Sequence, residues 1–157
     1  MPTTPFKATA ATLGLLLTFC HAWGADLTTT DIGNPTVAGS MTSTAGGYNI
    51  VGGGTNIFGT SDQFFFAYQE ITGDFDYRTR ISSLSLSDIW AKSGLMARET
   101  LVSTGRHASV FATPNVSGTF FSSRSTVAGV TANIGSFPTA YPNTWVRLKR
   151  VGSDFTG

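Results

Sequence analysis

The sequence has 157 residues, of which 12% are charged, 18 are glycine and 12 are phenylalanine. Its ten basic and nine acidic residues give a formal net charge of +1. This balance argues against a nucleic-acid partner or a polybasic membrane contact, which need a concentrated basic excess. The abundance of glycine and phenylalanine with few charges is typical of a β-rich extracellular domain.

The N-terminus has the layout of a secretory signal peptide. Residues 1–7 carry one positive charge, and an apolar run of 12 residues follows over Ala8–Phe19. That run is too short to span a bilayer, which takes about 20 residues. Small residues near Ala22 and Ala25 offer cleavage positions. We therefore expect residues 1–25 to be removed and the protein to be secreted, extracellular or periplasmic, with no membrane insertion.

Residues 26–157 are predicted to form one domain. Removal of Lys7 leaves nine basic and nine acidic residues, and the sole cysteine, Cys20, leaves with the signal. The remaining chain then has no disulfide, no thiolate nucleophile and no cysteine metal site. A chain of this length is long enough to bury a core of its own.

The first half of the domain predicts three strands. The first lies near Ile32–Val37, and a short one at Tyr48–Val51 runs into Gly52–Gly54, where side chains would obstruct a close backbone approach. The run Gln63–Gln69 (QFFFAYQ) is apolar on both of its faces. A strand of this kind belongs inside a two-sheet sandwich.

The second half alternates more clearly. In Phe75–Leu84, Asp76, Arg78 and Arg80 lie opposite the apolar residues. The further predicted strands are Ser93–Glu99, His107–Ala112, Gly118–Arg124, a weak one around Thr126–Val130, and Trp145–Val151. The last residues, Phe155–Gly157, look like the start of another strand.

Three segments resemble a known family. Gly59–Phe64 (GTSDQF), Trp90–Lys92 and Gly94–Glu99 (GLMARE) resemble a bacterial secreted domain family of the concanavalin A-like lectin/glucanase superfamily. The family is related to the C-terminal accessory domains of β-xylosidases and to regulation-of-enolase-like proteins. The resemblance implies a concanavalin A-like jelly-roll sandwich of two antiparallel sheets. In the family, further strands follow the Trp-x-Arg-Leu-x-Arg-x-Gly strand, so we expect the C-terminal strands to be missing here.

The sequence predicts no catalytic residues. A glycosidase needs two carboxyl groups, held about 5 Å apart or roughly 6.5–9.5 Å apart, and the Glu-x-Asp-x-x-Glu pattern of the glucanases is absent. Asp74 and Asp76 have the right spacing, but Asp74 lies in a turn and Arg78 is a candidate ion-pair partner for Asp76. His107, the only histidine after the signal, is expected to be a surface or packing residue. A non-catalytic domain is therefore favoured.

No cofactor is expected, but a calcium site stays open. Secreted sandwiches often bind calcium through loop carboxylates and carbonyls. Asp31, Asn34, Asn56 and Asp62 are loop oxygens that could converge, although no fixed spacing motif joins them.

The arginines suggest a ligand-binding face. Arg78 and Arg80 share one face of a strand, and Arg98 lies on the next; Arg124, Arg147 and Lys149 follow on later strands. If these strands are neighbours, the cations could line one sheet face together with Asp76, Trp90 and Glu99. Guanidinium forks and aromatic faces are what a sugar-binding groove uses. The alternative is a solvated face with weak cross-strand ion pairs.

The leading hypothesis is a non-catalytic carbohydrate-binding or accessory domain that recognises a polysaccharide or glycan. Its predicted ligand-binding residues are Arg78, Arg80, Trp90, Arg98 and Glu99. One alternative is a fragment of a glycoside hydrolase whose catalytic residues lie outside this chain, in a covalently linked catalytic domain. Another is a structural adhesion module of the cell surface.

Overall fold

The computed structural model describes residues 27–114 and 117–157. Twelve β-strands and no helix occur in these residues, which confirms the all-β prediction. The predicted signal peptide, residues 1–25, lies outside them. The strands are β1 (Thr28–Ile32), β2 (Ser40–Thr44), β3 (Gly47–Val51), β4 (Asn56–Phe58), β5 (Ser61–Tyr68), β6 (Phe75–Ile81), β7 (Ser93–Arg98), β8 (His107–Ala112), β9 (Thr119–Arg124), β10 (Ala132–Phe137), β11 (Thr144–Val151) and β12 (Asp154–Thr156). No helical segment long and apolar enough to cross a bilayer is found in this described part of the chain.

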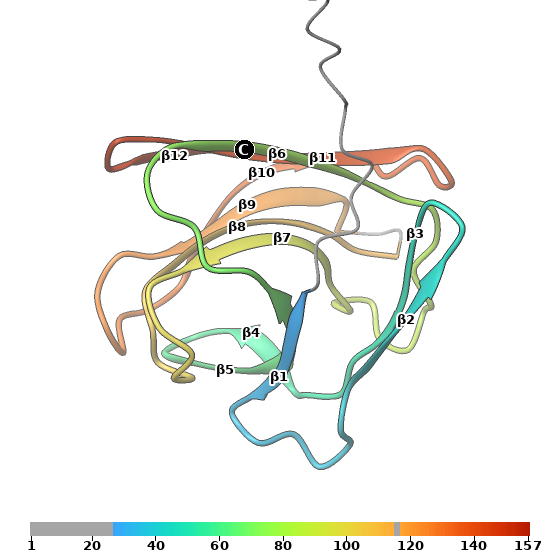
Figure 1. Cartoon of the computed structure of the whole chain (residues 1–157), viewed down its shortest axis with the longest axis horizontal. Coiled ribbons are helices and arrows are strands. Elements are labelled where there is room, and N and C mark those ends of the chain that lie inside the picture. Colours follow the sequence, from blue (N-terminus) through green and yellow to red (C-terminus); the bar gives the residue numbers. More distant parts are fainter. Residues whose placement is uncertain (1–26, 115–116) are drawn as a thin grey trace, which may run out of the picture.

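The strands form antiparallel sheets that stack in layers (Figure 1). The four-stranded sheet β10-β9-β8-β7 lies in the middle, with β12-β11-β6 on one side of it and β1-β5-β4 on the other. The β2–β3 hairpin stands beside them. The arrangement is consistent with a β-sandwich, although the described strands pair into four separate sheets rather than the two expected. The extra sheets arise because β1, β4 and β5, and likewise β2 and β3, pair only among themselves.

Two apolar cores hold the layers together. Every residue of β8 is buried, because neighbouring layers cover both of its faces. One core lies between β8 and the β6–β11 pair and consists of Ile81, Val110, Ala112, Val146 and Leu148. The other lies toward β4 and consists of Ile57, Phe111 and Phe120. Full burial of a large apolar side chain contributes about 1.5–3 kcal/mol, so these cores fix the distance between the layers.

The β6–β11 pair has one buried and one exposed face. β6 alternates half-buried and exposed residues down to the buried Ile81, and the first five residues of β11 alternate buried and exposed. Val146 and Leu148 thus point into the core, while Trp145 and Arg147 point away from it. The prediction that Arg78 and Arg80 share an outward face of one strand is confirmed.

Two strand predictions are wrong. The first strand covers Thr28–Ile32 rather than Ile32–Val37, because Gly33 and Asn34 follow it with φ angles of 74° and 54°, which an extended strand cannot adopt. The weak strand expected at Thr126–Val130 is a turn in which the Gly129 amide donates to the Thr126 carbonyl at 3.0 Å. The strand of that region lies later, at Ala132–Phe137.

The glycine-rich segment after β3 behaves as predicted. A Cβ on Gly53 would lie 2.3 Å from the Val37 carbonyl oxygen, and one on Gly54 would lie 2.0 Å from the Gln63 carbonyl oxygen. Neither position has room for a side chain. The short strands β2 and β4 were not predicted, because one is polar and exposed and the other has only three residues.

Candidate functional site

The outward face of β6 and β11 gathers most of the predicted cations. The two strands pair antiparallel over seven residue pairs, with Trp145 opposite Arg80 and Arg147 opposite Arg78. Because side chains alternate along a strand, every second residue of each strand projects from this face. Six residues form this outer face: Asp76, Arg78, Arg80, Trp145, Arg147 and Lys149.

An exposed ion pair occupies one part of the outer face. Arg147 donates from Nε to Asp76 Oδ1 at 2.7 Å and from Nη2 to Asp76 Oδ2. These hydrogen bonds lower the pKa of Asp76 and raise that of Arg147. The predicted partner of Asp76 was Arg78, so this detail is corrected. Arg78 is two residues away on the same strand, about 7 Å along it, whereas Arg147 reaches across from the neighbouring strand.

The other cations of the outer face make no direct polar contact within the described residues, and Lys149 and Arg78 only attract Asp76 through space. Arg78, Arg80 and Lys149 make no hydrogen bond or ion pair with any residue that the structure describes. The remaining basic side chains in the described ranges all donate a hydrogen bond: Lys92, Arg98, Arg106, Arg124, Arg147 and Arg150. The three basic side chains that make no hydrogen bond or ion pair within the described residues therefore all lie on the outer face.

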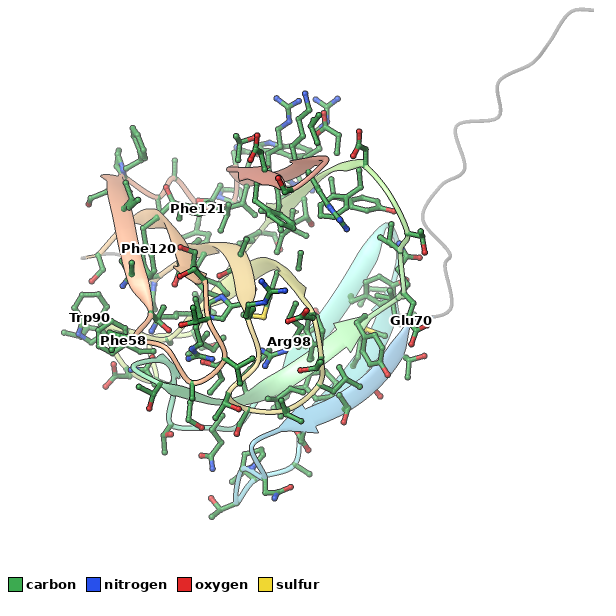
Figure 2. All side chains as sticks on the ribbon, turned by 90° about the vertical axis from the view of Figure 1, so that its left-hand side faces the viewer. Phe58, Glu70, Trp90, Arg98, Phe120 and Phe121 are labelled. Carbon is green, nitrogen blue, oxygen red and sulfur yellow. The ribbon has the colours of Figure 1, made fainter. Side chains whose placement is uncertain are left out.

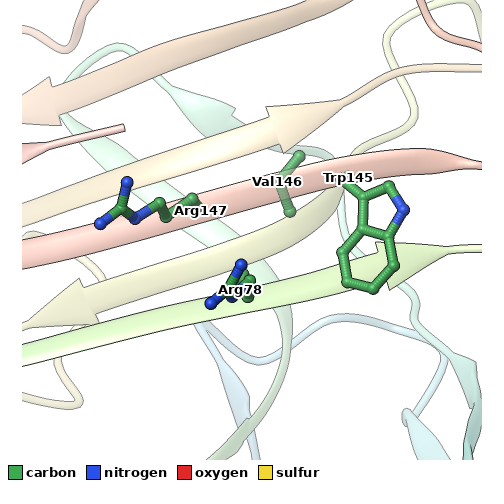
Figure 3. Close-up of a pocket in the computed structure, with 4 residues that line it drawn as sticks. All are labelled: Arg78, Trp145, Val146 and Arg147. Carbon is green, nitrogen blue, oxygen red and sulfur yellow. The ribbon is translucent and has the colours of Figure 1, made fainter.

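Trp145 places an aromatic surface beside these cations. Its side chain is 61% exposed, although a large indole is normally buried in part. Trp145, Arg78, Val146 and Arg147 line an open depression of about 520 Å³ (Figure 3). The indole stands at one end of this depression and the two guanidinium groups lie along it. The outer face can therefore stack an apolar ring and donate hydrogen bonds next to it.

Arg98 does not belong to the outer face. It ends β7, in the central sheet, and its side chain is only 2% exposed. Figure 2 shows it between the layers. It donates from Nη1 to Asp62 Oδ2 at 3.2 Å, and its other donors reach the carbonyls of Thr100 and Val102. Burial lowers the pKa of Arg98, and the neighbouring Asp62 opposes that shift.

Arg124 lies in the same interior cluster and is also not part of the outer face. It binds Asp62 through two hydrogen bonds, from Nη1 to Oδ2 at 2.8 Å and from Nη2 to Oδ1 at 2.6 Å. Both side chains are completely buried. Its donors also reach the hydroxyl of Thr131 and four backbone carbonyls, those of Gly59, Ser103, Gly105 and Gly129. A guanidinium with this many internal acceptors holds loops in place.

His107 is a packing residue, as one alternative in the sequence suggested. It lies opposite both Arg98 and Arg124 in the central sheet and is 6% exposed. Burial lowers its pKa to about 4, with the nearby arginines adding to the shift and Asp62 opposing it. Its Nδ1 lies 3.3 Å from the Ser109 hydroxyl.

Glu99 and Trp90 lie at two further places. Glu99 accepts two hydrogen bonds from Arg106, at 2.7 and 2.6 Å, in an exposed pair. Trp90 is 51% exposed in the loop before β7, near Phe58 at the edge of the molecule (Figure 2). The ammonium group of Lys92 lies 5.8 Å from the centre of the Trp90 ring. The structure thus brings together only Arg78 and Arg80 of the five predicted ligand-binding residues.

The single cationic face was expected because neighbouring charged strands were assumed to pair. β6 and β7 instead belong to different layers, so Arg98 and Glu99 cannot extend the row of Arg78 and Arg80. Trp145 was missed as a candidate. Its alternation with Arg147 in the pattern WVRLKRV was the available signal.

The residues considered for calcium were predicted to lie in loops, but Asp31, Asn56 and Asp62 lie in β1, β4 and β5. Their oxygens accept hydrogen bonds from the protein. Asp31 accepts from the Gly39 amide, Asn56 accepts from Lys92, and Asp62 accepts from two arginines. No group of three or more His, Cys, Asp or Glu side chains that could hold a metal ion occurs in the described residues.

No protein-family model, no curated protein and no solved structure significantly matches this chain. The outer face is therefore interpreted from its own chemistry.

Proposed function

We propose that the protein is a secreted, non-catalytic carbohydrate-binding domain that holds a glycan chain on the outer face of β6 and β11. The observation that supports this proposal is the exposed Trp145 beside Arg78 and Arg80, whose guanidinium groups make no hydrogen bond or ion pair within the described residues. We also propose that the layered sheets are a concanavalin A-like jelly roll of the family that the sequence resembles.

The chemistry of the outer face suits a sugar ring. A pyranose presents an apolar face of C–H groups, which packs against the flat indole of Trp145. Its hydroxyl groups accept hydrogen bonds, and each guanidinium donates two in parallel. Arg80 lies directly across from Trp145, so a ring stacked on the indole would have its hydroxyls beside that guanidinium.

The outer face supports binding rather than hydrolysis. It carries one carboxylate, Asp76, which is held by Arg147. A glycosidase of the usual kind needs a second carboxyl group across the scissile bond. Asp74 does not supply it, because it accepts the Gly152 amide at 2.7 Å and lies just before β6.

Glycan binding by the Trp145→Ala variant tests the proposal. We expect the wild-type protein to bind at least one polysaccharide on a glycan array, and this change to weaken binding about tenfold, since a stacked ring contributes about 1.4 kcal/mol. The matched control is Trp90→Ala, which removes another half-exposed tryptophan from a different part of the surface. Equal loss of binding in both variants, or binding that survives Trp145→Ala, would contradict the proposed location.

A further inference from the structure

The charge on the outer face points to one class of glycan. Its four cations and one carboxylate leave three net positive charges. The whole chain has a formal charge of only +1. The positive charge is therefore a local property of this face and not a consequence of a basic protein.

Repulsion between the cations also lowers the stability of the sheet when no ligand is bound. Arg78 and Arg147 are direct cross-strand partners, and like charges in that position destabilise a sheet. Asp76 offsets the positive charge of Arg147 through their ion pair. Arg78 forms no such ion pair within the described residues and has only the longer-range attraction of Asp76, and Arg80 also forms no ion pair there. An anion bound from outside would relieve this repulsion.

The geometry fits an extended ligand with repeated acid groups. Residues two apart on a strand are about 7 Å apart, and neighbouring strands are about 5 Å apart. Arg78 and Arg80 are spaced in this way along β6, as are Arg147 and Lys149 along β11. The row ends at Trp145, opposite Arg80, so one sugar ring can stack while the acid groups of the following residues meet cations.

We propose, resting on the glycan-binding function above, that the ligand is an acidic polysaccharide whose carboxylate or sulfate groups pair with Arg78, Arg80 and Lys149. Arginine suits this task because its fork matches either group with two parallel hydrogen bonds. The contacts are exposed, so binding weakens as the salt concentration rises.

Matched polymers test the charge requirement. Binding of the full chain is measured by isothermal titration calorimetry against polygalacturonate and its fully methyl-esterified form, and against dextran sulfate and dextran. Within each pair the sugar backbone is the same, and the acid groups are esterified or absent in the uncharged form. We expect binding to one or both charged polymers at 50 mM salt and at least tenfold weaker binding to the uncharged forms. The two charged polymers distinguish carboxylate from sulfate.

A double variant locates the contact. Arg78→Gln with Arg80→Gln removes two charges while keeping polar side chains, and we expect about tenfold weaker binding because exposed charge pairs contribute little individually. The control, Arg106→Gln with Arg150→Gln, removes the same charge from cations that bind internal partners. Thermal unfolding of both variants verifies that they are folded.

Each other outcome overturns a different claim. Equal binding to charged and uncharged polymers would refute the acid requirement and leave the glycan-binding function intact. Absence of binding to every glycan would refute both proposals. Equally tight, Arg78- and Arg80-dependent binding to duplex DNA or to vesicles of anionic lipid would show that the face recognises charge and not an acidic sugar.

Discussion

Replacement of Asp62 by alanine should destabilise the protein strongly. Among the described residues, Asp62 is the one carboxylate that contacts both Arg98 and Arg124, and all three side chains are at most 2% exposed. Its removal leaves two guanidinium groups in the interior without a counter-charge. Breaking a buried ion pair from one side costs about 3–5 kcal/mol. Since small domains have a total stability of about 5–15 kcal/mol, this one change removes a large part of it.

Urea unfolding followed by tryptophan fluorescence measures the loss. Asp62→Asn keeps one oxygen acceptor for Arg124, so its stability should lie between those of the wild type and Asp62→Ala. This variant can be compared with the wild type if the alanine variant does not fold. The control is Asp76→Ala, because Asp76 also pairs with an arginine but is exposed. We expect Asp62→Ala to lower the free energy of unfolding more than Asp76→Ala does. An equal or smaller loss in Asp62→Ala would refute the conclusion that burial makes the Asp62 ion pairs important for stability.

Two further predictions concern the central sheet. The pKa of His107 is lowered to about 4 in the folded state and is near 6.5 when unfolded, so the unfolded chain binds the proton first as the pH falls. Stability should therefore decrease by about 3 kcal/mol between pH 6.5 and pH 4, and urea unfolding at several pH values should show that His107→Gln removes this part of the pH dependence. Gly94 has no room for a side chain, since a Cβ would lie 1.9 Å from the Val110 carbonyl oxygen. Gly94→Ala should cost about 1–3 kcal/mol in thermal unfolding, whereas Gly47→Ala, with open space around it, should cost much less.

The strands and their faces were largely predictable from alternation. Phe75, Tyr77 and Ile81 alternate with Asp76 and Arg78, and the structure places the first group inward. Alternation is a local property, set by the two-residue repeat of a strand, so it needs no knowledge of the partner strand.

The site could be predicted only in part, because it depends on pairing over long distances in the chain. β6 pairs with β11, more than 60 residues later, and no local pattern specifies that choice. Arg98 was placed on the surface because charged side chains are rarely buried. Its partner Asp62 lies 36 residues earlier, so neither residue by itself reveals the buried pair.

The late pairing of β6 has a consequence for folding. Between synthesis of β6 and of its partner β11, the ribosome adds more than 60 residues, which takes several seconds at about 5–20 residues per second. During that time β6 is an unpaired strand with Phe75, Tyr77 and Ile81 along one side. Unpaired apolar strands aggregate, and charged side chains on a strand oppose this. We therefore expect Arg78 and Arg80 to oppose aggregation of the nascent chain before they can take part in any binding face.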